Sequence, residues 1–176
     1  WFFFPRDALR LFDHPVASMS LGCIPMGFAT LINGALLYLV PQGLVAPEVV
    51  AQFWWGDVML AIGVGLLVPF MMFTRQEHAI ERMSAVWLLP IVAAEVVAAS
   101  GALLLPHLTD HAEQLSVLLA SYVLWSCSVP LALGILVILF LRLVLHKLPP
   151  VSMAATSWLA LGPLGTGALA LILFSS

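Results

Sequence analysis

Five apolar stretches, each long enough to cross a membrane, dominate this chain. They cover about residues 15–40, 52–73, 84–105, 115–145 and 152–174. A helix needs about 20 residues to cross a hydrocarbon layer about 30 Å thick. Lipid offers no hydrogen-bond partners, so such runs must form helices, and they lack the alternation of a barrel strand. The sequence therefore predicts an all-α integral membrane protein with five transmembrane helices.

The composition agrees with a membrane environment, since the chain is 62% hydrophobic and only 9% charged. A soluble domain carries about 25% charged residues. The absence of a basic patch in the sequence makes nucleic acid an unfavourable partner. The connections are short, so residues 1–176 are predicted to form a single helical transmembrane unit. No initiator Met opens the chain, which favours a fragment of a longer transporter domain.

The basic residues predict the orientation. They fall before the first, third and fifth stretches as the pairs Arg6 and Arg10, Arg75 and Arg82, and Arg142 and Lys147. Lys and Arg are retained on the cytoplasmic side of a bilayer. We therefore expect the N-terminus of this segment in the cytoplasm, in a plasma membrane or bacterial cytoplasmic membrane. The positive charges of Arg6, Arg10, Arg75 and Arg142 could concentrate anions on the cytoplasmic side, or these residues could act only as topology anchors.

A repeat relates the first, third and fifth stretches, which begin about 70 residues apart. Each contains an interior proline, at Pro25, Pro90 and Pro163 respectively. An interior proline frees a backbone carbonyl, which membrane proteins tolerate only against protein or a water-filled cavity. Three parallel helices broken at similar depth predict a polar path between them. Prolines and glycines are also common in membrane helices, so any one proline has a purely structural alternative.

The most informative polar residue is Glu95, about ten residues into the third stretch. A carboxylate near the bilayer midplane costs at least a few kcal/mol unless it is protonated, paired or hydrated. It is either a titrating group that couples protons to an anion or a structural hydrogen-bond partner. Asp57 lies nearer the outer interface and is expected to be hydrated. The candidates for lining the path are Ser18, Pro25, Thr30, Pro90, Glu95, Ser100, Pro163 and Thr166.

Other classes of membrane protein fit less well. An intramembrane enzyme needs a nucleophile beside a base, but Ser100 and Glu95 do not share a helical face. A haem-holding bundle needs central His ligands, which the stretches lack. His107 and His111 lie in a short outer loop, where solvation is a better interpretation than metal binding. We therefore expect neither an enzyme, nor a cofactor, nor a metal site. Apart from Arg142 at the end of the fourth stretch, no basic residue lies inside a stretch, so anion selectivity would depend on helix dipoles, backbone N–H groups and hydroxyls.

Several motifs support a family assignment when taken in order. They are His14-Pro15-Val16, Ile24-Pro25-Met26-Gly27, Trp87-Leu88-Leu89-Pro90-Ile91-Val92, Ala99-Ser100-Gly101, Leu148-Pro149-Pro150 and Gly162-Pro163-Leu164-Gly165. Together they resemble the tellurite-resistance/dicarboxylate transporter family, which includes slow-type anion channels, malate permeases and sulfite efflux pumps. The last two motifs are most similar to the malate and sulfite branch.

This resemblance implies ten helices in five hairpins around a pore, with proline-kinked odd helices inside and often a trimeric assembly. The five stretches would be helices three to seven. The gating phenylalanine of the family belongs to the ninth helix, so that role is not transferred to Phe28. The implied function is transport of small anions, either C4-dicarboxylates such as malate or sulfite. The alternatives are a chloride or nitrate channel of the same fold, or a cofactor-holding membrane bundle.

Overall fold

The computed structural model describes residue 12, residues 14–148 and residues 151–175. Within these residues all regular structure is helical. Five helices are long and apolar enough to cross a membrane: Ser18–Leu39, Pro47–Thr74, Ala85–His107, His111–His146 and Ala154–Phe174. The predicted all-α membrane class and the five spans are confirmed.

The first, third and fifth spans are composite. The first consists of a 3₁₀-helix η1 (Ser18–Gly22), α2 (Cys23–Gly34) and a π-helical turn η2 (Ala35–Leu39). The third consists of 3₁₀-helix η4 (Ala85–Leu88), α4 (Leu89–Leu104) and η5 (Leu105–His107). The fifth consists of 3₁₀-helix η6 (Val151–Ala160) and α6 (Leu161–Phe174). The second and fourth are the continuous helices α3 (Pro47–Thr74) and α5 (His111–His146), and a short η3 (Ile80–Arg82) follows α3.

Both continuous helices begin several residues earlier than their apolar stretches predicted. Helix α3 starts at Pro47, with Glu48 in its first turn. Asp110 caps α5, since its carboxylate accepts hydrogen bonds from the amides of Ala112 and Glu113, both at 3.3 Å. A first helical turn with unpaired amides favours proline and acidic residues. Those polar turns lie outside a purely apolar pattern.

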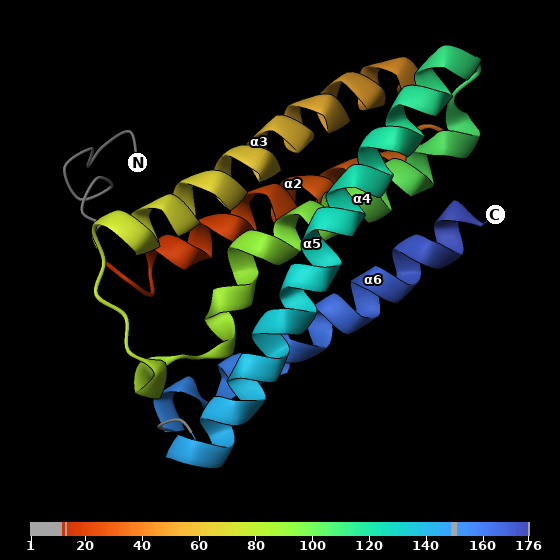
Figure 1. The fold of residues 1–176 in the computed structure, drawn as a ribbon. Coiled ribbons are helices and arrows are strands. Elements are labelled where there is room, and N and C mark those ends of the chain that lie inside the picture. Colours follow the sequence, from red (N-terminus) through yellow and green to blue (C-terminus); the bar gives the residue numbers. More distant parts are fainter. Residues whose placement is uncertain (1–11, 13, 149–150, 176) are drawn as a thin grey trace.

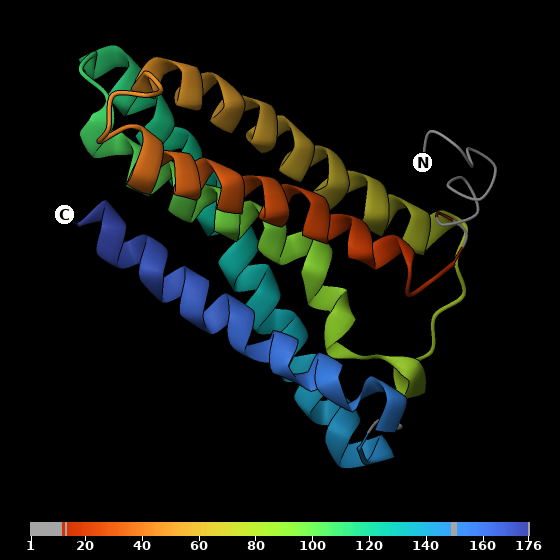
Figure 2. The same cartoon turned by 180° about the vertical axis from the view of Figure 1, so that it is seen from behind.

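Helix α4 occupies the middle of the bundle and packs against α2, α3, α5 and α6 (Figure 1). Of its span, 67% is buried inside the structure, against 17–33% for the other four. Helices α3 and α5 cover one side of α4, and α2 and α6 flank it on the other side (Figure 2). Helix packing in lipid depends on close approach at small residues. A Cβ at Gly22 would overlap the Leu89 carbonyl, so η1 lies directly against the start of α4.

The three repeat prolines lie where 3₁₀-helix changes to α-helix. Pro25 is the third residue of α2, Pro90 the second of α4 and Pro163 the third of α6. Proline is tolerated in the first turn of an α-helix because its missing N–H would have no partner there. The predicted breaks are therefore junctions between two helical forms. Pro69 and Pro130, by contrast, lie inside the uninterrupted helices α3 and α5.

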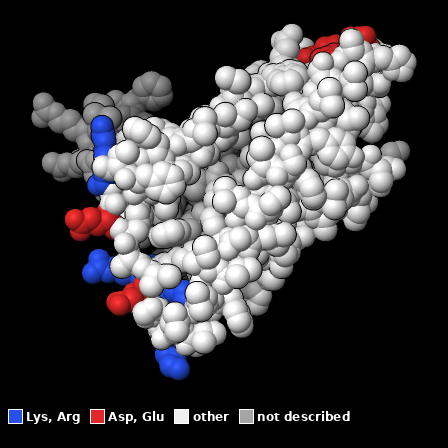
Figure 3. All heavy atoms as spheres, in the orientation of Figure 1, with Lys and Arg blue, Asp and Glu red and all other residues white. Residues whose placement is uncertain are grey.

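The exposed charged residues that the structure describes lie at the two ends of the molecule, and the basic ones gather at one end, together with Glu77 and Glu81 (Figure 3). Arg75, Arg82, Arg142 and Lys147 lie at the end where η3, η4 and η6 meet, and Figure 3 shows Lys and Arg at that end with only acidic residues at the far end. Those far acidic residues are Glu48, Asp110 and Glu113. Arg6 and Arg10 lie outside the described residues. So do Pro149 and Pro150 of the Leu148-Pro149-Pro150 motif.

Candidate anion path and its polar groups

The three proline junctions lie at nearly the same depth. Gly22 of η1 lies beside Leu89 and Pro90 at the start of α4. Farther along, Thr166 of α6 is hydrogen-bonded to Glu95 of α4. At about 1.5 Å per residue, these two contacts place Pro25, Pro90 and Pro163 within about one helical turn of one another along parallel helices. The structure therefore has the coincidence in depth that the sequence predicted.

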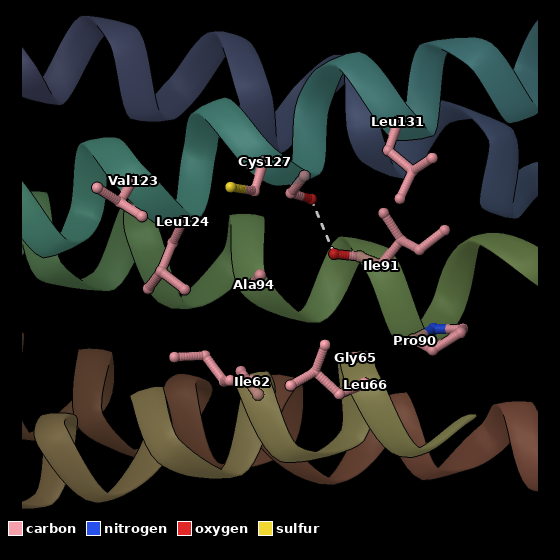
Figure 4. Close-up of a pocket in the computed structure, with 12 residues that line it drawn as sticks. Ile62, Gly65, Leu66, Pro90, Ile91, Ala94, Val123, Leu124, Cys127 and Leu131 are labelled. Carbon is pink, nitrogen blue, oxygen red and sulfur yellow. Dashed lines mark hydrogen bonds between the residues drawn. The ribbon is translucent and has the colours of Figure 1, made fainter. Parts of the chain in front are cut away.

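All three prolines are buried, but Pro90 faces away from the space between α2 and α6. It lines a groove of about 330 Å³ between α3 and α5 (Figure 4). No lining residue of this groove is charged, and its Ser128 hydroxyl donates to the Ile91 carbonyl at 2.8 Å. Such a surface suits hydrocarbon better than an anion. Pro90 therefore contributes to the junction in α4 rather than to a polar wall.

Glu95 and Thr166 are the two predicted site residues that the structure brings into contact. Glu95 is fully buried, and its Oε1 accepts a hydrogen bond from the Thr166 hydroxyl. The other oxygen, Oε2, has no partner among the described residues. Gly167 permits the approach, because a Cβ there would lie 3.1 Å from Oε1. Trp125 of α5 donates to the Gly167 carbonyl at 3.1 Å, which joins three helices at this point.

The Thr166 hydroxyl has two acceptors within reach and a single proton. Its oxygen lies 2.9 Å from the Gly162 carbonyl and is also bonded to Glu95. A hydroxyl can donate one hydrogen bond and accept two. If the Glu95 carboxyl is neutral, it donates to Thr166, and Thr166 donates to Gly162, so every proton has one acceptor. An ionised Glu95 would instead compete with the Gly162 carbonyl for that proton.

The remaining predicted hydroxyls are separate from this pair. Thr30 donates to the Met26 carbonyl at 2.9 Å, and Ser100 donates to the Val96 carbonyl at 3.1 Å. Ser18 lies at the basic end, where Gln76 donates to its hydroxyl at 3.0 Å. Bonds to a carbonyl one turn back satisfy a hydroxyl within its own helix. Thr30 and Ser100 could therefore donate to a passing anion only by giving up an existing hydrogen bond.

Asp57 is a buried carboxyl whose environment the sequence interpretation got wrong. It was expected to be hydrated near the outer interface, but it is fully buried and both oxygens lack a partner among the described residues. Trp54, one turn away, donates to the Val97 carbonyl of α4 at 2.9 Å. This contact places Asp57 near the level of Glu95, on another side of α4. The sequence could have indicated this burial. Asp57 continues the spacing of three and four residues that relates the buried residues Val50, Trp54, Ala61, Val64 and Val68.

The basic residues also differ from the expectation. Arg75 and Arg82 are exposed, as a charged mouth requires. Arg142, however, is buried and donates to the backbone carbonyls of Glu81 and Lys147. It therefore ties the end of α5 to η3. In the described part of the chain, no three His, Cys, Asp or Glu side chains gather as metal ligands.

The comparisons with known proteins agree with this architecture. Residues 1–176 match the family described as voltage-dependent anion channel. The chain belongs to this family. Voltage-dependent anion channels and the similar proteins named below are channels and transporters by name, not enzymes. No solved structure matches the chain.

Curated relatives in fungi and archaea cover nearly all of the chain. It is 43% identical over 169 residues to a sulfite efflux pump of Arthroderma otae, covering 96% of this chain and 45% of that protein. It is 33% identical over 175 residues to an uncharacterized transporter of Methanocaldococcus jannaschii, covering 98% of this chain and 48% of that protein. A sulfite efflux pump of Candida albicans is 32% identical over 180 residues, covering 99% of this chain and 36% of that protein. The chain thus spans less than half the length of these relatives.

Proposed function

We propose that the protein carries small anions, sulfite foremost, across a membrane. The observation that carries this proposal is the coincidence of three 3₁₀-to-α junctions in parallel helices around one buried carboxyl. Membership of the anion channel family and the similarity to proteins named sulfite efflux pumps support it. C4-dicarboxylates such as malate, and inorganic anions such as chloride and nitrate, are alternative cargoes of the same path.

The path runs between α2 and α6 along one face of α4. Successive residues of an α-helix are about 100° apart. On α4, Glu95 is directed to α6, Val97 and Gly101 to Trp54 of α3, and the Ile91 carbonyl to α5. The sector that remains between α6 and α2 carries Val96 and Leu103, which are half-buried, whereas Val92 and Ser100 at its edges are buried. This face is apolar apart from the buried Ser100 hydroxyl, so it would hold an anion weakly and let it pass.

Small residues line the flanks of this sector. On α2, Gly27, Thr30 and Gly34 share one side of the helix. On α6, Gly162 and Gly165 share the side away from α5. A Cβ at any of these four glycines would meet no atom within 4 Å. Such surfaces leave room for an ion beside the backbone, whose helix dipoles supply partial charge. The opposite wall would come from further helices or from other subunits, and a trimer is the assembly we propose.

Glu95 has a proton-binding role in this proposal. A bare carboxylate beside the path would repel an anion, whereas a neutral one would not. The chain of hydrogen bonds from Glu95 through Thr166 to Gly162 is complete when the carboxyl carries its proton. Loss and gain of that proton would then couple anion movement to pH. We place the protein in a plasma membrane or bacterial cytoplasmic membrane, with the N-terminus of this segment in the cytoplasm.

The test is flux into liposomes that contain the purified protein. Radiolabelled sulfite, malate and chloride are compared, and sulfite is expected to enter fastest. Gly165→Leu on α6 should reduce that flux strongly because it fills the proposed path. Gly134→Leu is the matched control, because Gly134 is also exposed, with nothing within 4 Å of an added Cβ, but lies on α5. Equal flux in the two variants would reject the path, and no flux of any anion would reject the function.

A further inference from the structure

Arg142 is a buried cation that the proposed path does not use. Only 5% of its surface is exposed, near the end of α5. Its Nε and Nη2 donate to the Glu81 carbonyl at 3.2 Å and 2.8 Å, and its Nη1 donates to the Lys147 carbonyl at 2.7 Å. These bonds fix the plane of the guanidinium group. The side chain is therefore held in one orientation rather than extended into solvent.

The hydrogen bonds of Arg142 do not exhaust its capacity. A guanidinium group has five N–H donors. Three of them are used by carbonyl oxygens, which leaves two when only described residues are considered. Carbonyls carry partial charge, so these acceptors do not neutralise the cation. A buried charge without a counter-charge destabilises the folded protein. An anion that reached this charge would therefore lower the free energy of the folded state.

A small pocket lies against this residue. It has a volume of about 80 Å³ and is lined by Arg142 of α5, by Ser84 before η4, and by Thr156, Ser157 and Ala160 of η6. One water molecule needs about 10–15 Å³ of such cavity volume, so the pocket has room for an ion of several heavy atoms. Ser157 is exposed, which gives the pocket an opening. Apolar side chains of Met83, Ala85, Leu139 and Leu143 complete the lining, so three hydroxyl-bearing residues and a fixed cation share one partly open space.

We propose that this pocket binds one small oxyanion, either a free ion such as sulfite or phosphate, or the phosphate of a lipid headgroup. A planar guanidinium fork matches two oxygens of an oxyanion and gives short, charge-assisted hydrogen bonds. Chloride offers one centre and cannot use the fork in that way. The site lies at the basic end of the molecule, outside the α2–α6 sector. It does not depend on the proposed path or on Glu95.

The first test measures the thermal unfolding of the full-length protein in a neutral detergent. Added sulfite or phosphate should raise the midpoint in a saturable way, and equal chloride should not. Ala160→Phe should fill the pocket while leaving the three carbonyl bonds of Arg142 in place, and it should weaken oxyanion binding about tenfold or more. Arg82→Gln is the matched control, because Arg82 is an exposed cation at the same end that does not line this pocket, and oxyanion binding should be unchanged in this variant.

The second test distinguishes the source of the oxyanion. The same unfolding experiment is run in nanodiscs of neutral lipid with and without an anionic phospholipid. Stabilisation by the lipid alone, lost in Ala160→Phe, would assign the site to a headgroup. Stabilisation by free sulfite or phosphate would assign it to a soluble ion. Equal responses of the Ala160→Phe and Arg82→Gln variants, or no response to any oxyanion, would overturn the proposal whatever the flux experiments show.

Discussion

At the scale of single residues, the glycines divide into those that permit contact and those that leave space. Gly22, Gly101 and Gly167 lie against other helices, whereas Gly27, Gly34, Gly162 and Gly165 have no neighbour within 4 Å of an added Cβ. Contact glycines determine how closely helices approach in lipid. Space glycines determine how much room remains beside the proposed path. The same residue type therefore has two physical roles, and substitutions can separate them.

We expect Gly22→Ala to destabilise the protein and Gly27→Ala to leave it intact. An added methyl at Gly22 overlaps the Leu89 carbonyl, and backbone atoms cannot move aside as a flexible side chain can. Overpacking of this kind costs about 1–3 kcal/mol. Ala is favoured over Gly inside a helix by about 0.5–1 kcal/mol, and Gly27 has open space. Thermal unfolding in detergent measures the difference, and equal midpoints would contradict the packing of η1 on α4.

We expect Glu95→Gln to fold normally and to change the pH dependence of transport. The glutamine amide can donate to the Thr166 hydroxyl and so replaces a neutral carboxyl. It cannot titrate, so flux should vary less between acidic and neutral pH than in the unsubstituted protein. Flux at several pH values measures this, with Glu48→Gln on the exposed start of α3 as control. Unchanged pH dependence would reject coupling, and loss of folding would make Glu95 a structural group.

At the scale of elements, apolar length predicted the five spans but not their internal form. The 3₁₀ segments η1, η4 and η6 contain no charged residue, so each continues the apolar stretch of the α-helix that follows it. Only the prolines indicated where the form changes. Burial was harder still, since α4 is central although the most apolar stretch of its span has a mean hydropathy of 2.2, against 2.5 for that of α5. Which helix is surrounded by the others depends on tertiary packing, and a local sequence pattern does not determine tertiary packing.

Side-chain direction explains why the site was only partly predictable. Glu95 was identified because a carboxyl is rare at membrane depth. Its hydrogen bond to Thr166 could not be predicted, because that bond depends on how α4 and α6 align along their axes. The two residues are 71 positions apart in sequence. Arg142 was read as an exposed charge because a basic residue at a helix end normally is one. Its carbonyl partners come from η3, 61 residues away, and from the residue that ends α5, so the arrangement cannot be inferred from residue spacing.

Asp57 is a polar residue on the packed face of helix α3, and its burial lowers the stability of the protein. We therefore expect Asp57→Val to stabilise the protein. The Asp57 carboxyl is fully buried, and its oxygens lack partners among the described residues. Removing an unsatisfied buried polar group recovers about 1–3 kcal/mol. Glu48→Val on the exposed start of the same helix should change stability by less than about 0.5 kcal/mol. A lower unfolding midpoint for Asp57→Val would mean that the carboxyl has a bound partner, such as water.

At the scale of the whole molecule, the charge asymmetry between the two ends of the helices favours the orientation that we propose. Arg75, Arg82, Arg142 and Lys147 gather at the end where α2, α4 and α6 are preceded by 3₁₀ segments, and the far end carries acidic residues (Figure 3). Cationic loops stay in the cytoplasm. The Arg142 pocket and the exposed Arg82 would then meet cytoplasmic anions before those anions reach the junctions. An exporter of small anions would benefit from such a concentration of positive charge on the side of supply.

Cysteine labelling in intact cells tests this orientation. In a background of Cys23→Ala and Cys127→Ala, single cysteines are placed at the exposed positions Gln42 and Ala79. Gln42 lies in the loop before α3, and Ala79 lies in the basic loop before η3. A membrane-impermeant maleimide should label Gln42→Cys directly and Ala79→Cys only after permeabilisation. The reverse pattern would put the basic end outside, and it would remove the physical reason for placing anion capture by Arg142 upstream of the path.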